Sequence, residues 1–334
     1  MKSVVLCAGC LAACGRIGFD QLGAGDATTN GIGDGALSSC AGLAATCGPA
    51  GTSPCCGSSI VPGGTFYRSY DVGSDGTYSD MTNPATVSDF RFDTYEVTVG
   101  RFRQFVNAGM GTQASPPQAG AGARTLNGMA NQGGWDPSWN ESLTANTAAL
   151  LAAVSCDATP SWTDSPGANE ALPMTCISWF EAFAFCAWDG GFLATDAEWN
   201  YAAVGGAEQR AYPWSNPASD LTIDCSHANY QPAGVCENPP NGGVNRVGSE
   251  SPTGDGKWGQ ADLAGNALEF ALDWYQATLQ NPCNDCAVLT ASGAGRMMRG
   301  GDYDSVAPLV RGADHFFNTL AREDFIGTRC ARAP

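Results

Sequence analysis

The chain has 334 residues, a formal net charge of −17 and only two lysines, Lys2 and Lys257. So acidic a surface repels nucleic acid and anionic lipid head groups, which argues against both as partners of the folded part. The 43 glycines, the 19 prolines and the 15% charged residues indicate a loop-rich globular protein, and the 43% hydrophobic content argues against wholesale disorder.

The first residues resemble an export signal. Lys2 precedes a short apolar stretch over residues 4–13, which is too short to span a bilayer and suits a signal sequence. The segment Leu11-Ala12-Ala13-Cys14 resembles a bacterial lipobox, in which the cysteine is lipidated after cleavage before it. We therefore expect a signal peptide over 1–13, a lipid on Cys14 and an extracytoplasmic protein anchored to the bacterial cell envelope. A buried N-terminal helix is the alternative.

Cysteine usage also indicates export. Of the 15 cysteines, two lie within the signal peptide and Cys14 takes the lipid, which leaves an even set of 12. Even sets in exported chains are read as disulfides. Residues 14–38 are rich in Gly, Ala, Thr, Asn and Asp and are predicted to be a flexible tether. The Cys-rich subregion, residues 39–57, would need disulfides among its own four cysteines to hold a shape, namely Cys40, Cys47, Cys55 and Cys56.

One large domain is predicted over residues 58–334. Its first strand is expected near residues 60–66, and residues 90–95 alternate apolar and polar side chains as a half-buried strand does. Thr98 is placed to cap a helix over 99–108, and Gly109 is placed to end it. Residues 111–168 are polar, with glycine, proline and tryptophan scattered through them, and we expect a long irregular loop there.

Two later helix starts match the capping box, in which a hydroxyl and a glutamate three residues on bind the free N–H groups. The pairs are Ser178 with Glu181 and Thr195 with Glu198. The first of these helices is expected to run to about residue 188 and to present one apolar face. Residues 297–298 and 326–330 are predicted to be short closing strands.

Eight motifs in collinear order make the chain resemble the formylglycine-generating enzyme family, the sulfatase-modifying factors. The motifs are VPGGTF (61–66), FDTYEVT (92–98), LPM with ISW (172–179), LATDAEWNYAA (193–203), YPW (212–214), LAGNALEF (263–270), RGG (299–301) and GTRC (327–330). Each is weak alone, but together they are spread in order over about 270 residues. The resemblance implies an α+β fold of the formylglycine-generating-enzyme type, C-type-lectin-like, disulfide-rich and poor in regular secondary structure.

The resemblance also bears on the disulfides. It implies a bridge between Cys186 and Cys330, because both positions match a linked pair in the family. Taken with sequence separation, it suggests three further pairs, which are Cys156 with Cys176, Cys225 with Cys236, and Cys283 with Cys286. The pairing within residues 40–56 stays open.

The reaction centre is where the chain departs from the family. In members of the family, two cysteines just past the Arg-Gly-Gly turn bind copper(I), and these enzymes oxidise a sulfatase cysteine to formylglycine. Here Ser305 and Val310 occupy those positions. Copper(I) selects soft thiolate ligands, so copper is not expected and no catalytic residue is assigned. Cys283 and Cys286 have the C-x-x-C spacing of redox or metal sites, but a structural disulfide is the simpler interpretation in an exported chain.

Calcium is the metal that the resemblance favours. It implies side-chain ligands from Asp262 and Glu269 and backbone carbonyl ligands from Leu263, Gly265 and Ala267. Carboxylates and carbonyls are the ligands that calcium prefers, and we expect a structural ion. A second family site would begin at Asn229 and Tyr230, whose remaining ligands are not recognisable. A plain Gly-Asn turn is the alternative for the first site.

Iron is less well supported. A non-haem iron site needs two histidines that converge on one metal with a carboxylate. The chain has only His227 and His315, and nothing in the sequence indicates that they meet.

The tryptophans of the presumed loops allow two interpretations. They would either line a peptide or glycan groove or anchor the loops by burial; they are Trp135, Trp139, Trp162, Trp214 and Trp258. The sequence as a whole predicts an extracytoplasmic lipoprotein without oxidase activity, acting as a calcium-stabilised module that binds a peptide, protein or glycan. The alternative is a formylglycine-generating oxidase acting on sulfatases, or a related metal-dependent oxidoreductase.

Overall fold

The computed structural model describes residues 37–157, 159–231, 236, 243–291, 293, 295–318 and 320–334. The expected signal peptide, Cys14 and nearly all of the tether lie outside these residues. The described residues belong to one compact unit, in which no helix has the length and apolar character needed to cross a membrane.

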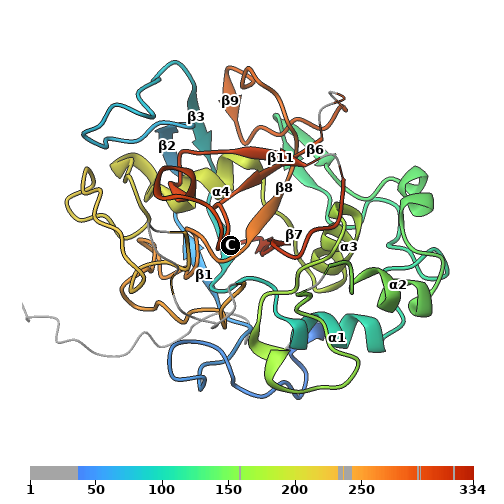
Figure 1. The fold of residues 1–334 in the computed structure, drawn as a ribbon. Coiled ribbons are helices and arrows are strands. Elements are labelled where there is room, and N and C mark those ends of the chain that lie inside the picture. The colour runs from blue at the N-terminus through green and yellow to red at the C-terminus, as the bar shows by residue number, and fades with distance from the viewer. Residues whose placement is uncertain are drawn as a thin grey trace, which may run out of the picture. The chain divides into compact units, whose positions relative to one another are not determined.

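Short helices and short strands are joined by long loops in this unit (Figure 1). The helices are α1 (Val99–Asn107), α2 (Thr147–Ala153), α3 (Trp179–Trp188) and α4 (Asp196–Ala203). The strands are β1 (Ser58–Val61), β2 (Gly64–Tyr67), β3 (Pro84–Val87), β4 (Phe90–Asp93), β5 (Arg124–Leu126), β6 (Met129–Gln132), β7 (Phe192–Leu193), β8 (Leu268–Trp274), β9 (Cys283–Asn284), β10 (Arg296–Arg299), β11 (Phe316–Asn318), β12 (Ile326–Gly327) and β13 (Cys330–Arg332). The α+β class and the low content of regular structure are confirmed.

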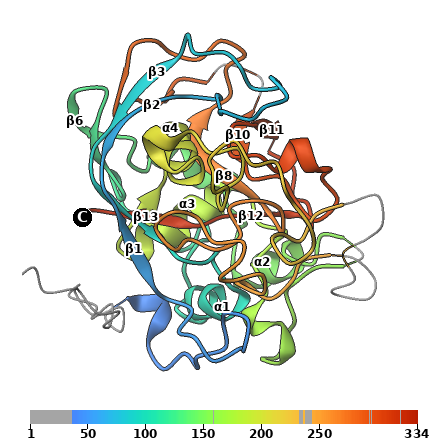
Figure 2. The same ribbon diagram turned by 90° about the vertical axis from the view of Figure 1, so that its left-hand side faces the viewer.

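Two four-stranded sheets bring distant parts of the sequence together. One has the order β1-β4-β13-β7, in which Ala331 of β13 lies opposite Phe92 of β4. The other has the order β11-β10-β8-β12, and a smaller sheet has the order β2-β3-β9. In both views α1 lies at one end of the unit, and β2 and β3 lie at the other (Figure 2).

Helices α1, α3 and α4 begin at the capping residues that the sequence predicts. Both predicted capping boxes are formed, at Ser178 for α3 and at Thr195 for α4. Thr98 caps α1 through the N–H of Arg101, and α1 ends just before Gly109, whose φ of 72° only glycine adopts freely. Helix α3 is buried nearly all round, so it runs through the core and does not present a single apolar face as expected.

Two local expectations need correction. Residues 111–168 are not simply irregular, because they hold a hairpin of β5 and β6 and the helix α2. The hairpin turns at Asn127-Gly128, a strong hairpin signal, and Asn146 caps α2. The expected first strand is split into β1 and β2 at Gly63, where a Cβ would lie only 2.4 Å from the carbonyl oxygen of Val87.

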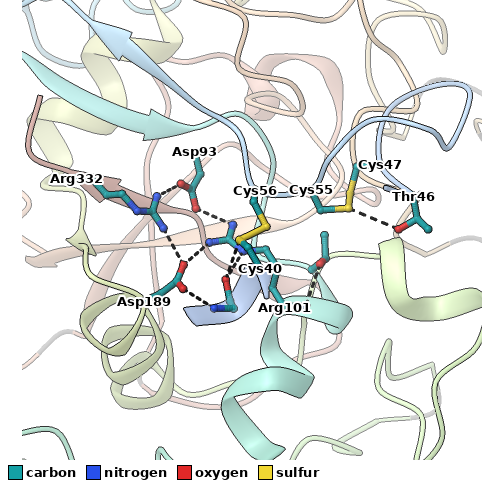
Figure 3. Close-up of a disulfide and its surroundings, with 11 residues drawn as sticks. Cys40, Thr46, Cys47, Cys55, Cys56, Asp93, Arg101, Asp189 and Arg332 are labelled. Atoms are coloured by element: carbon teal, nitrogen blue, oxygen red, sulfur yellow. Dashed lines mark hydrogen bonds and ion pairs between the residues drawn. A yellow bond between two sulfur atoms is a disulfide. The ribbon is translucent and has the colours of Figure 1, made fainter. Parts of the chain in front are cut away.

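Six disulfides link loops and strands within the described residues. The four pairings suggested by sequence are those that the structure forms, and within the Cys-rich subregion the pairs are Cys40–Cys56 and Cys47–Cys55. This subregion also contacts the main domain through hydrogen bonds (Figure 3). The backbone N–H of Ser39 donates to Asp189, 2.8 Å away, and Arg101 donates to the Ser39 hydroxyl, 3.0 Å away. Disulfides are therefore not its only support.

Candidate functional site

Val310, which stands where the family has its second copper-binding cysteine, is part of a packed core. Val310 ends a short 3-10 helix, Ala307–Val310, and is 0% exposed. It belongs to an apolar cluster with Tyr212 and Tyr230. It also packs on the Gly300-Gly301 turn so closely that a Cβ at Gly301 would lie 2.7 Å from its Cγ1. No space for a reaction is left at this side chain.

Ser305, which stands where the family has its first copper-binding cysteine, is held in place by hydrogen bonds. Ser305 is 8% exposed; its hydroxyl donates to Asp302 Oδ1, 2.9 Å away, and accepts from the Asp302 N–H, 3.1 Å away. Every cysteine that the structure describes is in a disulfide. These residues offer no thiolate at the turn, so the donor set does not fit copper(I).

The surface above this centre is apolar and aromatic. Val306 is 45% exposed and Leu309 is 37% exposed. The Tyr212 hydroxyl donates to the carbonyl of Ala307, 3.0 Å away, and so joins this helix to a stack of rings. In the stack, Trp214 lies 5.0 Å from Tyr212 and 5.1 Å from His227 between ring centroids. We call Trp214, His227, Val306 and Leu309 the outer aromatic surface.

The predicted calcium loop is folded against the second predicted segment. The Asn266 N–H donates to the carbonyl of Asn229, 2.8 Å away. Asp262 is buried and accepts from the Gly248 N–H at 2.6 Å. Glu269 is already paired: its oxygens lie 2.8 and 2.9 Å from Arg329 Nε, and Oε2 also accepts from the Trp199 indole at 2.7 Å. Of the two predicted carboxylate ligands, Asp262 is the one without a cationic partner in direct contact.

Asp262 belongs to a buried group of carboxylates, the acidic cluster, formed by Glu96, Glu250, Asp262 and Glu269. Asn266 donates to Glu96 at 3.0 Å, and Asn245 donates to Glu250 at 2.7 Å. Burial, then the charge of Asp262, raises the pKa of Glu96 well above its usual range and that of Glu250 to about 8. Burial raises the pKa of Asp262 to about 6.

The acidic cluster fits calcium only in part. Carboxylate oxygens with little counter-charge suit a hard divalent cation. Across the described part of the chain, however, no group of three or more His, Cys, Asp or Glu side chains is arranged around a common metal position, and Glu269 would have to leave Arg329 to become a ligand. Calcium therefore stays a prediction, and no chemistry is derived from it.

The two histidines lie in different surroundings. His227 contacts Asp224 Oδ1, 2.8 Å from its Nδ1, and stacks on Trp214. The His315 Nδ1 lies 3.1 Å from the Ser69 hydroxyl. Among the residues that the structure describes, the side chains around these histidines do not form the donor set of a non-haem iron site.

Most of the loop tryptophans are anchors. Trp135 and Trp162 are buried, and Trp139 packs on the core against Trp179 at 5.2 Å. Trp214 and Trp258 keep partial exposure, and of these Trp214 lies beside the position of the family's reaction centre. The pairing of Ser69 with His315, 246 residues apart, is absent from the sequence-based prediction, because no local motif marks either residue.

The comparisons with known proteins agree with the motifs. The sulfatase-modifying factor enzyme 1-like domain matches residues 44–334. A formylglycine-generating enzyme of Streptomyces coelicolor is 34% identical over 48% of this chain and 52% of its own length. An inactive Cα-formylglycine-generating enzyme 2 of Bos taurus is 34% identical over 33% of this chain and 36% of its own length. The chain thus spans about half or less of these two relatives.

A solved structure supports the fold. PvdO from Pseudomonas aeruginosa superposes with a TM-score of 0.56 at 18% identity, covering 82% of this chain and 93% of that one. At this level of identity the likeness concerns the fold alone.

Proposed function

The chain belongs to the sulfatase-modifying factor enzyme 1-like family, and we propose that it is an extracytoplasmic member that binds a ligand and does not carry out the cysteine oxidation. The six disulfides indicate an oxidising compartment outside the cytoplasm.

One observation carries the proposal. Where the oxidase needs two thiolates, this chain has a hydrogen-bonded serine and a fully buried valine, Ser305 and Val310. Thiolates are what holds copper(I), and a nearby pair to replace them is missing because the described cysteines are bonded to each other. A relative of the same family named as inactive is in line with this reading.

The oxidase test uses copper and a peptide substrate. The purified protein is incubated with copper and a Cys-x-Pro-x-Arg peptide, and aldehyde formation is followed by mass spectrometry. We expect no aldehyde and no stoichiometric copper. The double variant Ser305→Cys/Val310→Cys is the matched comparison, because it returns two thiols to the turn. Aldehyde formed by the unaltered protein with one copper per chain would restore the oxidase alternative.

The outer aromatic surface is the proposed ligand-binding face. Exposed aliphatic side chains beside a partly exposed stack of rings are typical of binding surfaces. A screen of immobilised peptides, proteins and glycans identifies the ligand class. Trp214→Ala and Leu309→Asp should each reduce binding about tenfold or more, whereas Met129→Asp, on the exposed strand β6, should not. Equal binding by all four proteins would reject this face.

The envelope anchor is a separate part of the proposal. If Cys14 carries the lipid, the full chain should sediment with membranes, and Cys14→Ser should release it. The two lysines and the net charge of −17 leave the folded part little attraction for anionic lipid. A Cys14→Ser protein that still sediments with membranes would remove the lipid anchor from the proposal.

A further inference from the structure

Ser69 has an unusual backbone for its residue type. It follows β2 and has a φ of 52°, in the left-handed region that residues other than glycine adopt at a cost. Its N–H donates to the side-chain oxygen of Asn200, 2.9 Å away, which helps to hold this conformation. Its side chain is partly exposed. Residues held in sparsely populated backbone regions cluster at active sites and ligand clamps.

A base lies within hydrogen-bond distance of its hydroxyl. His315 Nδ1 is 3.1 Å from Ser69 Oγ. Burial, then the charge of Arg299, lowers the pKa of His315, while the charge of Asp196 raises it. A lowered pKa favours the neutral ring, which is able to accept a proton. A serine hydroxyl bonded to a neutral imidazole is the pairing that activates a serine nucleophile.

A fixed cation points at the same oxygen. Arg299 is fully buried and is held by Asp196, 2.6 Å from its Nε, and by the carbonyl of Asp314, 2.8 Å from its Nη1. Its Nη2 donates to Ser69 Oγ at 3.3 Å. Because Arg299 occupies an acceptor position of Oγ, the hydroxyl proton is left to bond His315. A preorganised positive group beside the reacting atom stabilises negative charge as it develops.

An apolar surface borders this group. The Tyr275 ring lies 5.8 Å from the His315 ring and 4.6 Å from the Phe317 ring. Phe317 is 49% exposed. An aromatic pair with one exposed ring beside a nucleophile suits the apolar part of an acyl group.

We propose that Ser69, His315 and Arg299 form a second centre, a serine nucleophile that cleaves carboxylic esters. Ser69 Oγ bonds to the acyl carbon as its proton passes to His315 Nδ1. The ester C–O bond then breaks, and the leaving alcohol takes the proton from His315. Water, deprotonated by His315, next cleaves the acyl-serine to a carboxylic acid and restores the hydroxyl. Arg299, which donates to Ser69 Oγ, stabilises the negative charge that develops on this oxygen as its proton leaves, and no oxidant is required. This proposal does not depend on whether the protein binds copper or oxidises cysteine.

The test uses the purified protein with a fluorophosphonate probe and p-nitrophenyl butyrate. The probe should modify Ser69, identified by peptide mass mapping, and the ester should be hydrolysed with a burst of one equivalent. Ser69→Gly should abolish both. It should also fold, because glycine adopts a positive φ without strain. His315→Gln keeps a hydrogen-bonding side chain without a base, and its rate should fall about 10²–10⁴-fold.

The control variant is Ser74→Ala, which removes an exposed hydroxyl from the loop after Ser69. It should be modified and should hydrolyse ester as the unaltered protein does. The proposal is overturned if the probe leaves Ser69 unmodified. It is equally overturned if Ser69→Gly, shown to be folded by circular dichroism, hydrolyses the ester at the unaltered rate.

Discussion

Two groups of buried charged side chains lie close together in this protein and differ in the number of cations that balance their carboxylates. The balanced network beneath the Cys-rich subregion has two carboxylates, Asp93 and Asp189, and two guanidinium groups, Arg101 and Arg332 (Figure 3). The acidic cluster has four carboxylates, and its direct ion pair is that of Glu269 with Arg329. Asp93 and Glu96, three residues apart in the sequence, belong to the two different groups.

The difference decides the pKa values. Burial alone would raise the pKa of Asp93, but Arg332 and Arg101 more than offset it, so the pKa is lowered. Glu96 is equally buried, and the neighbouring Asp262 adds to the effect of burial, so the pKa of Glu96 is raised well above its usual range. Burial of a carboxylate therefore does not set its charge; the counter-charges supplied by the fold do.

The largest expected effect comes from breaking the balanced network. Arg101 donates to Asp93 at 2.8 Å and to Asp189 at 2.7 Å, and all three side chains are fully buried. Arg101→Met leaves both carboxylates short of a partner, so the free energy of unfolding should fall by about 3–5 kcal/mol. Urea denaturation of the purified protein measures this fall.

The matched control is Arg210→Met. Arg210 pairs with the more exposed Glu208, and such pairs contribute about 0–1 kcal/mol. Arg101→Lys keeps the charge without the forked geometry and should fall between the two. Equal losses from Arg101→Met and Arg210→Met would show that the balanced network does not stabilise the fold.

Calcium should remove the difference between the two groups. A divalent cation at the acidic cluster would supply the positive charge that the balanced network has from arginine. Calcium at 100 times its Kd should raise the free energy of unfolding by about 2.7 kcal/mol, and a chelator should reverse this. Melting curves with calcium and with chelator measure the shift. A melting temperature that neither calcium nor chelator changes contradicts the structural ion.

Glu250→Gln sharpens this test. One oxygen of Glu250 is buried without a hydrogen-bond partner, so its charge opposes folding when no cation is bound. In chelator at pH 8 the variant should be about 1 kcal/mol more stable than the unaltered protein, while its response to calcium should shrink. If the variant is less stable than the unaltered protein in chelator, the acidic cluster does not hold unbalanced negative charge that opposes folding.

The sequence predicts local features of the fold well where a short motif determines them. The capping boxes at Ser178 and Thr195 and the Thr98 cap are examples, since each bonds N–H groups three residues away. The hairpin at Asn127-Gly128 carried such a signal too, but the surrounding polar composition obscured it. The family motifs gave the fold class and the Cys186–Cys330 bridge, because that pair is a property of the fold.

Which side chains pack or pair with one another at the sites was harder to predict, because these contacts join distant segments of the sequence. The sequence shows that Ser305 and Val310 are not cysteines, but not that Val310 packs between Tyr212 and the Gly301 turn. It offers Glu269 as a calcium ligand, whereas Arg329, 60 residues on, occupies that carboxylate. Ser69 and His315 meet only through the folded chain. Contacts between residues so far apart in the sequence produce no motif or regular spacing from which they could be predicted.

The smallest expected effect is the acid sensitivity of the balanced network. A carboxylate whose folded pKa is lowered adds stability above its unfolded pKa and loses it as the pH falls through the folded pKa. Because the pKa of Asp93 is lowered by Arg332 and Arg101 against the effect of burial, this stability should be lost below about pH 4. Between pH 5 and pH 3 the unaltered protein should lose about 2–4 °C of melting temperature more than Asp93→Asn, as expected for about 1 kcal/mol. The exposed Asp164→Asn is the control and should follow the unaltered protein. If Asp93→Asn loses as much as the unaltered protein, Asp93 does not hold its charge through the balanced network, and the contrast with the acidic cluster fails.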